Sequence, residues 1–235
     1  MNAPPGRRCV VVTGAAGNLG QAVVAHFAAQ GARLALLNRQ RATLEATFSA
    51  SDDCLLLPAD LLDAAQTAAA VATAVQRFGR IDALCHLAGG FRMGEAVHET
   101  SAATWNFLAD INVRTLLNVA QAVVPQMLAQ GRGHIVTVGA ASALRGAAQM
   151  GAYTAAKSAV IRLTESMSAE LRVRGINVNC VLPTIIDTPE NRAAMPKADP
   201  ARWVAPAALA EVIGFLCSDA ARAVHGAALP VAGLS

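Results

Sequence analysis

Residues 10–20, with the sequence VVVTGAAGNLG, decide the fold of this chain. The three valines predict a buried strand, and the helix predicted to start near Leu19 follows after a short turn. Gly14 allows the tight turn, Gly17 lets a phosphate approach the backbone, and Gly20 lets the helix pack closely against the strand. The free N–H groups at the start of that helix would bind a pyrophosphate. The stretch therefore predicts a dinucleotide-binding fold, against the alternative of an ordinary strand–helix turn.

Strands and helices are predicted to alternate along the rest of the chain. Continuous apolar runs indicate strands buried on both faces, and a glycine closes four of the helices, at positions 31, 79, 131 and 175. The pattern predicts an α/β, doubly wound, Rossmann-like fold: a parallel seven-stranded sheet with helices on both faces. The predicted strands are Cys9–Thr13, Arg33–Leu37, Cys54–Pro58, Ile81–His86, His134–Gly139, Ile176–Leu182 and Ala227–Val231. The predicted helices are Leu19–Gln30, Thr43–Phe48, Ala64–Phe78, Thr104–Gln130, Met150–Arg174 and Pro206–Ser218.

The chain shows no linker and no internal repeat beyond the strand–helix unit, so residues 1–235 are predicted to form one domain. One long stretch, from Pro183 to Ala205, lacks clear periodicity and contains four prolines. Long loops in compact domains are usually functional. Residues 184–205 are therefore predicted to form a substrate lid.

Composition limits the classes of protein to which the chain can belong. Hydrophobic residues make up 54% and charged residues 15%, which excludes a disordered chain. The net charge of +3 comes with scattered arginines, so no nucleic-acid partner is predicted. The five cysteines form no CxxC motif, and the sequence predicts no metal site. The thiols are predicted to be reduced, and segment 1–8 does not resemble a signal peptide, so a cytoplasmic protein is predicted. The chain lacks a charge-free apolar run of about 18 residues, so no membrane span is predicted.

A tyrosine and a lysine four residues apart form a second informative pattern. Tyr153 is the only tyrosine in the chain, and Lys157 lies one helical turn after it, on the same predicted helix face. A phenol exchanges a proton at neutral pH when its anion is stabilised, and a cation about 4–6 Å away favours that anion. The pair predicts a general acid or base, against the alternative of a surface pair on an amphipathic helix.

The glycine-rich turn and the Tyr–Lys pair resemble the TGxxxGxG turn and the YxxxK motif of the short-chain dehydrogenase/reductase family, and the resemblance spans essentially the whole chain. It implies that Tyr153 is the general acid or base, and that Lys157 binds the nicotinamide ribose and lowers the tyrosine pKa. It also implies that Asn112 supports a proton relay through water; the alternative is a polar residue satisfied inside a long helix. The family's middle glycine falls at Asn18, a residue type that tolerates left-handed backbone.

Three further segments resemble cofactor-contacting parts of the family. PADL at 58–61 resembles the segment whose aspartate contacts adenine, and VLPTIIDTP at 181–189 resembles the segment beside the nicotinamide, with Thr184 in place of a glycine. HLAG at 86–89 stands where the family usually has NNAG, and we interpret His86 as structural. The predicted cofactor-binding residues are Thr13, Gly14, Gly17, Asn18, Leu19, Gly20, Asn38, Arg39, Asp60, Leu61, Ala88, Gly89, Tyr153, Lys157, Pro183, Ile186 and Thr188.

The family's catalytic serine is missing. It would lie thirteen residues before Tyr153, where this chain has Ala140. Ser142 replaces it only if the chain stays extended and both side chains point the same way. Otherwise the substrate needs no such donor, as in serine-less relatives of the dihydropteridine reductase type, or the protein only binds a nucleotide. Ser142 is therefore a candidate catalytic residue, and the alternative is an ordinary loop serine.

The end of the second strand indicates the type of cofactor. An aspartate there would bind the adenosine ribose and repel a 2′-phosphate, but this chain has neutral Asn38 followed by Arg39. A guanidinium pairs well with a phosphate, whereas a solvated loop charge is the alternative. The sequence therefore favours NADP(H), with NAD(H) as the alternative.

The leading hypothesis is an NAD(P)(H)-dependent oxidoreductase that transfers hydride between the nicotinamide and a carbonyl or alcohol, as 3-oxoacyl or ketone reductases do. Reduction of a conjugated ring, similar to the dihydropteridine reductase reaction, is the runner-up. A non-catalytic nucleotide-sensing protein is the alternative of another class. The resemblance also implies a small-molecule substrate and a homotetramer, or a homodimer, built on helices Thr104–Gln130 and Met150–Arg174.

Overall fold

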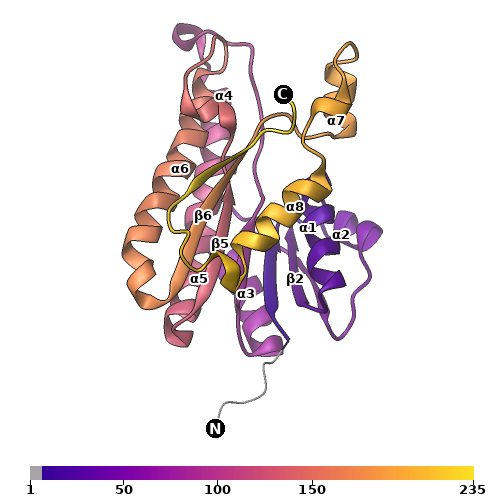
Figure 1. Cartoon of the computed structure of the whole chain (residues 1–235), viewed down its shortest axis with the longest axis vertical. Coiled ribbons are helices and arrows are strands. Elements are labelled where there is room, and N and C mark those ends of the chain that lie inside the picture. The colour runs from indigo at the N-terminus through magenta and orange to yellow at the C-terminus, as the bar shows by residue number, and fades with distance from the viewer. Residues whose placement is uncertain (1–6) are drawn as a thin grey trace.

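The computed structural model describes residues 7–235, and its seven strands form one parallel sheet in the order β3-β2-β1-β4-β5-β6-β7 (Figure 1). This order confirms the predicted doubly wound, Rossmann-like architecture. Chain order reverses between β1 and β4, the place where such sheets bind ligands at the carboxyl ends of their strands. The strands are β1 Cys9–Thr13, β2 Arg33–Asn38, β3 Cys54–Pro58, β4 Ala83–His86, β5 Gly133–Val138, β6 Ile176–Pro183 and β7 Ala228–Val231.

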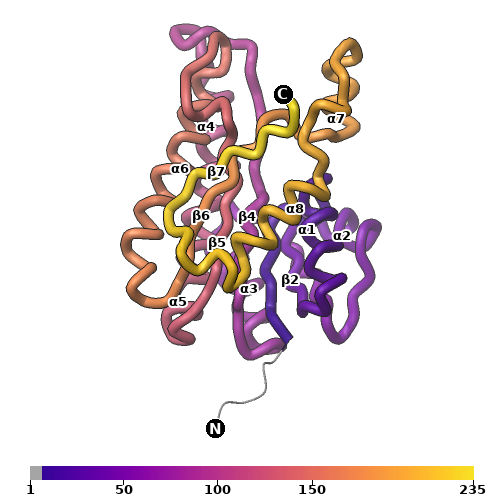
Figure 2. Tube along the Cα trace, in the orientation of Figure 1, coloured from indigo at the N-terminus to yellow at the C-terminus, as the bar shows by residue number. Residues whose placement is uncertain are grey.

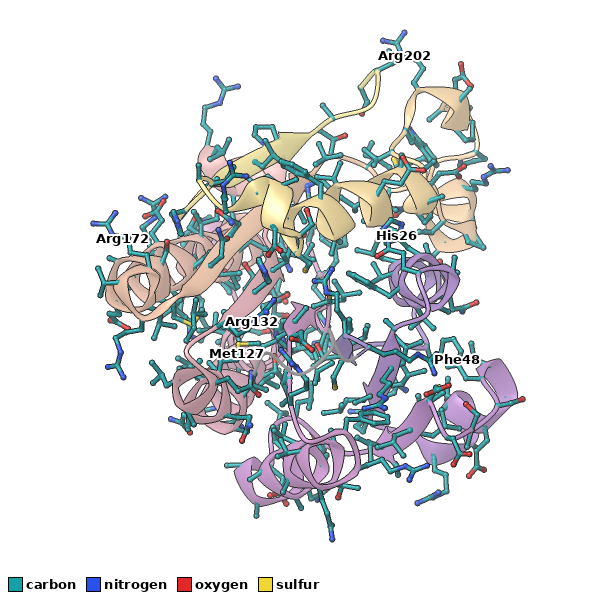
Figure 3. All side chains as sticks on the ribbon, turned by 60° about the horizontal axis from the view of Figure 1, so that its bottom comes forward. His26, Phe48, Met127, Arg132, Arg172 and Arg202 are labelled. Carbon is teal, nitrogen blue, oxygen red and sulfur yellow. The ribbon has the colours of Figure 1, made fainter. Side chains whose placement is uncertain are left out.

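Helices cover both faces of the sheet (Figure 2). They are α1 Asn18–Ala29, α2 Arg41–Thr47, α3 Ala64–Phe78, α4 Ala102–Ala109, α5 Thr115–Gln130, α6 Gly151–Leu171, α7 Pro189–Ala194 and α8 Pro206–Leu216. One core cluster packs α1, α2 and α8 on the sheet, and a second packs α3, α5 and the end of α6 on the other face. Figure 3 shows the two helix layers, with His26 on the α1 side and Met127 on the α5 side.

Two close contacts explain how tightly these layers pack. A Cβ at Gly214 of α8 would lie 2.0 Å from the Nε2 atom of His26 on α1. A Cβ at Gly133, the first residue of β5, would lie 2.4 Å from the Met127 sulfur. A side chain at Gly133 would displace the buried Met127, whereas a side chain at Gly214 would require the His26 ring to move aside.

The predicted helix Thr104–Gln130 is wrong in two respects. It starts at Ala102, and a π-helical turn, Asp110–Arg114, separates α4 from α5. The Asn112 amide donates to the Leu108 carbonyl at 3.0 Å and so takes an acceptor that the backbone ladder would otherwise use. Such π turns are frequent at functional sites, because they turn a side chain toward the site.

The segment 184–205 is more ordered than its sequence predicts. It contains α7 and a 3₁₀ turn, Pro200–Arg202. The Thr188 hydroxyl caps α7 by accepting from the Asn191 N–H at 3.2 Å. Smaller corrections apply to helix Met150–Arg174, whose last three residues form a 3₁₀ turn, and to several element ends that move by one or two residues.

The run Ala102–Gln130 is long and apolar enough to cross a membrane by length and composition, with a mean hydropathy of 1.2 in its most apolar window. It also carries Asp110 and Arg114, and one side of α5 packs on the sheet through Leu116, Val119 and Val123. The prediction that segment 1–8 is no leader concerns residues that lie mostly outside the described part of the chain.

Candidate active site

A cleft of about 500 Å³ runs along the carboxyl ends of β1, β2, β3 and β4. Its size suits an extended small-molecule ligand. Eight residues predicted to bind the cofactor line it: Gly14, Gly17, Asn38, Arg39, Asp60, Leu61, Ala88 and Gly89. Sequence reasoning missed Ala16, Gln40, Thr43, Ala59, Leu62, Gly90, Phe107, Ile111 and Thr115. Most of these are apolar or small, so they carry no motif that would have revealed them.

The glycine-rich turn between β1 and α1 has the geometry that its sequence predicts. Gly14 has φ +64°, which favours glycine, and a Cβ at Gly20 would lie 2.3 Å from the Gly14 carbonyl oxygen. Leu19 packs on the core behind the turn. Asn18 does not adopt left-handed backbone: it begins α1, and its side-chain amide donates to the Glu190 carboxylate of α7 at 2.8 Å. Its tolerance of positive φ is therefore not what preserves the turn.

Asn112 and Lys157 meet beside Gly89. A Cβ at Gly89 would lie 2.9 Å from the Asn112 Oδ1 atom and 3.1 Å from the Lys157 Nζ atom. Asn112 is fixed from both sides, since its amide donates to the Gly90 carbonyl at 3.0 Å and its Oδ1 accepts from the Gly90 N–H at 3.2 Å. The Lys157 ammonium donates to the Val138 carbonyl at 2.9 Å. Both groups thus border the end of the cleft nearest to α6.

Tyr153 has an apolar environment. Its ring packs edge-to-face on Phe91, with 4.8 Å between ring centroids, and borders the apolar cluster that contains Ala140. Burial raises the pKa of Tyr153 to about 12. Burial also lowers the pKa of Lys157 to about 8, a change that nearby Cys180 opposes. Burial is the cause of the raised tyrosine pKa, and the Lys157 ammonium is hydrogen-bonded to the Val138 carbonyl; that Lys157 lowers the tyrosine pKa stays a prediction.

The chain does not stay extended after Ala140, so the condition for Ser142 to replace the missing serine is not met. Ala140 itself has φ −159° and ψ 146°, but Ala141–Leu144 form a 3₁₀ turn, closed by a bond from the Ala143 N–H to the Ala140 carbonyl at 3.0 Å. Within residues 7–235 the Ser142 hydroxyl has no hydrogen-bond partner. Ala140 is buried and supplies no donor.

The far end of the cleft holds the residues predicted to bind the adenosine. Arg39 lines the cleft and forms no ion pair with another residue of the segment 7–235, whereas Arg41 pairs with Glu45 at 3.3 Å. Asn38 ends β2 and is neutral. The Asp60 carboxylate accepts from the Leu62 N–H at 3.0 Å, so it also stabilises a local turn.

The segment after β6 lies beyond the lining of this cleft. Pro183 ends β6, Ile186 forms a parallel bridge with Val204, and Thr188 caps α7. The Asn18–Glu190 bond joins α7 to the glycine-rich turn. This bond places α7 beside the start of α1, where a pyrophosphate would bind.

The buried side chain of His86 contacts Thr13 at the end of β1 and Thr115 at the start of α5. The Thr13 hydroxyl accepts from the N–H groups of Leu87 and Ala88 at 3.1 and 3.2 Å, so its own proton is free for His86 Nδ1 at 3.1 Å. The proton of the neutral ring then lies on Nε2, which faces the Thr115 hydroxyl at 3.5 Å. His86 therefore joins β1 to the start of α5, in agreement with a structural role.

Protonation of His86 is expected to destabilise the fold. Burial, aided by the positive charge of Lys157, lowers the pKa of His86 to about 3. An unfolded chain binds this proton below about pH 6.5, and the folded chain only near pH 3. The free energy of unfolding should therefore fall with decreasing pH between these values, by roughly 1.4 kcal/mol per pH unit from this group. Urea unfolding at a series of pH values measures the slope.

The variant His86→Asn should flatten that slope, because asparagine does not titrate. His134, whose pKa burial also lowers, leaves a residual slope. Exposed His98 provides the matched control, and His98→Asn should leave the slope unchanged. An equally steep slope in His86→Asn would show that another group takes up the proton.

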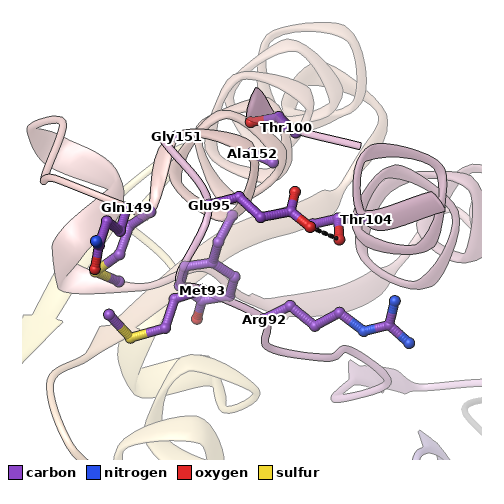
Figure 4. A pocket seen from close by; sticks show the side chains of 10 residues that line it. Arg92, Met93, Glu95, Thr100, Thr104, Gln149, Gly151 and Ala152 are labelled. Atoms are coloured by element: carbon purple, nitrogen blue, oxygen red, sulfur yellow. Dashed lines mark hydrogen bonds between the residues drawn. The ribbon is translucent and has the colours of Figure 1, made fainter. Parts of the chain in front are cut away.

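A second, narrow cavity of about 10 Å³ adjoins Tyr153 (Figure 4). Its lining consists of Arg92, Met93, Glu95, Thr100, Thr104 and residues 149–153. Glu95 accepts from the Thr104 hydroxyl at 2.9 Å, which holds the loop before α4 in place. Arg92 stacks over the Phe107 ring at 3.7 Å and extends away from Gln149 in Figure 4. This cavity has room for about one water molecule, so it marks the Tyr153 side of the cleft as the candidate substrate side but does not itself enclose a substrate.

The comparisons with known proteins agree with this geometry. The family model of the short chain dehydrogenases matches residues 8–199. The 2-(R)-hydroxypropyl-CoM dehydrogenase of Xanthobacter autotrophicus is 33% identical over 96% of this chain and 97% of its own. The 3-oxoacyl-[acyl-carrier-protein] reductase of Thermotoga maritima is 31% identical over 97% of both chains.

Solved structures are similar over the whole length. Levodione reductase superposes with a TM-score of 0.88 at 30% identity and 96% coverage of both chains. A 3-ketoacyl-(acyl-carrier-protein) reductase from Brucella melitensis, complexed with NADH, has the same TM-score at 27% identity, covering 97% of this chain and 98% of that one. Fold and site together define an NAD(P)-dependent oxidoreductase of alcohols and ketones. The chain belongs to the short-chain dehydrogenase/reductase family.

Proposed function

We propose that this protein reduces a small-molecule ketone with NADPH, and that Tyr153 donates the proton to the carbonyl oxygen. The single observation that supports this most is the position of Tyr153, on a cavity beside the end of the cleft where Lys157 and Asn112 meet. The cleft and the glycine-rich turn fit a dinucleotide, because Gly14 and Gly20 leave no room for a Cβ. NADPH, when bound, supplies the hydride.

The chain's own groups then handle binding and the proton. Burial raises the pKa of Tyr153 to about 12, so the phenol carries its proton at neutral pH, and efficient donation requires a group that stabilises the phenolate during the reaction. Lys157, with a pKa of about 8, stays mainly charged and can hold the ribose hydroxyls. Asn112 fixes the backbone at Gly90 through two hydrogen bonds. Water supplies the proton relay beside it.

The preference for NADP(H) rests on the second strand. Arg39 lines the cleft without an ion-pair partner in residues 7–235, and no carboxylate stands at Asn38 to repel a 2′-phosphate. Arg41 is engaged with Glu45, so Arg39 is the better phosphate ligand.

Arg39→Ala is expected to weaken NADPH binding about tenfold or more and to change NADH binding little, because only NADPH carries the 2′-phosphate. Titration of the protein fluorescence with each cofactor measures both Kd values. Arg41→Ala is the matched control and should alter neither value by much. Equal losses for both cofactors in Arg39→Ala would assign the guanidinium a different role.

We further propose that the serine function was abandoned rather than moved to Ser142. Support comes from the 3₁₀ turn after Ala140, because the turn takes Ser142 out of the extended path on which it would point the same way as residue 140. Such a site would suit a substrate whose oxygen needs no second donor. Reduction of a quinonoid ring, as in dihydropteridine reductase, is the second candidate function on this ground.

Two single variants test this point. Ser142→Ala should be nearly silent in kcat/KM, whereas a relocated donor would make it cost ~3 kcal/mol. Ala140→Ser should raise turnover of simple ketones without helping the natural substrate. A panel of ketones, 3-oxoacyl thioesters and quinonoid dihydropterins, followed by NADPH absorbance, measures both. A large loss in Ser142→Ala with unchanged cofactor binding would restore Ser142 as the donor.

We propose one domain over residues 1–235, a substrate lid at 184–205, which the Asn18–Glu190 bond supports, and a cytoplasmic location, which the five free cysteines support. Self-association into a tetramer or dimer through a second copy of the α4–α5 and α6 surface is supported by exposed Trp105 and Leu117 on the apolar run 102–130.

A further inference from the structure

We infer that Gln149 determines substrate specificity: its side-chain amide binds a second oxygen function on the ketone, near the carbonyl that Tyr153 protonates. The inference rests on the proposed carbonyl reduction and names the class of substrate, a ketone that carries another carbonyl or hydroxyl group.

The backbone of Gln149 is the first observation. Its φ is +61°, and it is the only residue other than glycine with a positive φ within residues 7–235. Glutamine gains nothing locally from this conformation, which favours glycine and, less strongly, asparagine. Strained residues of this kind persist where the surrounding structure enforces them, often at ligand-binding sites.

The surrounding structure does enforce it. The Gln149 carbonyl accepts from the Gly94 N–H at 2.9 Å, which ties the loop before α6 to the loop after β4. These two loops form opposite walls of the cavity beside Tyr153. The left-handed residue is thus the point where the two walls join, four residues before the proposed proton donor.

The side chain of Gln149 is available for a ligand. It lines the cavity and is exposed, and it has no hydrogen-bond partner within the described part of the chain. The other polar side chains of the cavity are differently placed: Glu95 and Thr104 bond to each other, and Arg92 stacks on Phe107. Figure 4 shows Gln149 on the opposite side of the cavity from Arg92.

The chemistry of the amide sets the class of substrate. It offers both N–H donors and a carbonyl acceptor without charge, so it suits a neutral carbonyl or hydroxyl. Met93 and Met150 add apolar surface to the lining, and Phe91 packs on Tyr153 beside it. A neutral ketone with an apolar body and one additional oxygen function matches this surface.

Three substitutions at Gln149 separate the amide from the backbone. Gln149→Ala removes the amide and keeps the strained φ. Gln149→Gly removes the amide and relieves the strain. Gln149→Asn keeps an amide on a residue that tolerates positive φ. The substrates are ethyl 3-oxobutanoate, which has a second carbonyl, and 2-heptanone, which lacks one, and kcat/KM is measured for both with NADPH.

We expect Gln149→Ala and Gln149→Gly to lower kcat/KM for ethyl 3-oxobutanoate roughly 5- to 10-fold, the loss of one hydrogen bond, and to leave 2-heptanone within twofold. Gln149→Asn should retain part of the preference. The glycine variant should melt about 2–4 °C above the alanine variant, which shows that the backbone is strained as described.

The possible outcomes test the role of Gln149 separately from the proposed ketone reduction. An unchanged ratio between the two ketones in the glycine and alanine variants, with wild-type turnover intact, would overturn the role of Gln149 alone. Equal losses on both ketones would show a structural role and also overturn it. No wild-type turnover of either ketone would refute the proposed reduction and the inference with it.

Discussion

Replacement of Tyr153 by phenylalanine is expected to lower kcat for ketone reduction by ~10² or more, the scale of general acid catalysis. The change removes one oxygen and keeps the ring, so the edge-to-face contact with Phe91 and the packing near Ala140 persist. Thermal stability and NADPH affinity should therefore stay close to wild type. Steady-state kinetics, a thermal melt and a cofactor titration on one preparation measure all three quantities.

Retention of most activity in Tyr153→Phe would assign the proton donor elsewhere. A parallel loss of cofactor affinity would instead indicate that the phenol mainly binds the ribose. The expected result, a loss in kcat alone, supports proton donation by the group whose pKa burial raises to about 12.

The second large effect is expected at Gly20. In Gly20→Ala the new Cβ would lie 2.3 Å from the Gly14 carbonyl oxygen and 2.4 Å from that of Ala15, and both are backbone atoms. The turn must move, so α1 can no longer present its N-terminus to a pyrophosphate as before. We expect the Kd for NADPH to rise at least tenfold and the melting temperature to fall by several degrees.

Gly146 provides the matched control for this substitution. A Cβ there meets nothing within 4 Å and its φ is not positive, so Gly146→Ala should leave both the NADPH affinity and the melting temperature near their wild-type values. Normal cofactor binding by Gly20→Ala would contradict the close approach of strand and helix on which the proposed phosphate site depends.

The elements that the sequence predicted best are those set by local pattern. The ranges Cys9–Thr13, Cys54–Pro58 and Ala64–Phe78 agree with the structure, because apolar runs, Asp63 as an N-cap and Gly79 as a left-handed end are local signals. The interruption at Asn112 was not predictable, since the amide that takes the Leu108 carbonyl is also held by Gly90, which lies 22 residues earlier in the chain. Helix α7 was missed because prolines and short length obscure its periodicity.

The site shows the same division. The sequence motifs were sufficient to predict that Gly14, Arg39 and Gly89 bind the same cofactor, and all three line one cleft. The state of Tyr153 was not predictable from spacing, because its pKa depends on burial by Phe91 and Ala140 from other elements. Gln149 carries no motif, and only the backbone geometry distinguishes it from the neighbouring loop residues.

Transfer of deuterium from NADPH labelled at nicotinamide C4 tests the central claim most directly. The labelled cofactor is incubated with the wild-type protein and a ketone, and the product is analysed by mass spectrometry and NMR. Hydride transfer to a carbonyl predicts an alcohol with one deuterium on the carbinol carbon, and a rate that depends on Tyr153. Tight NADPH binding with no labelled alcohol from any ketone or 3-oxoacyl thioester, and no NADPH oxidation with a quinonoid dihydropterin, would contradict catalysis at this site.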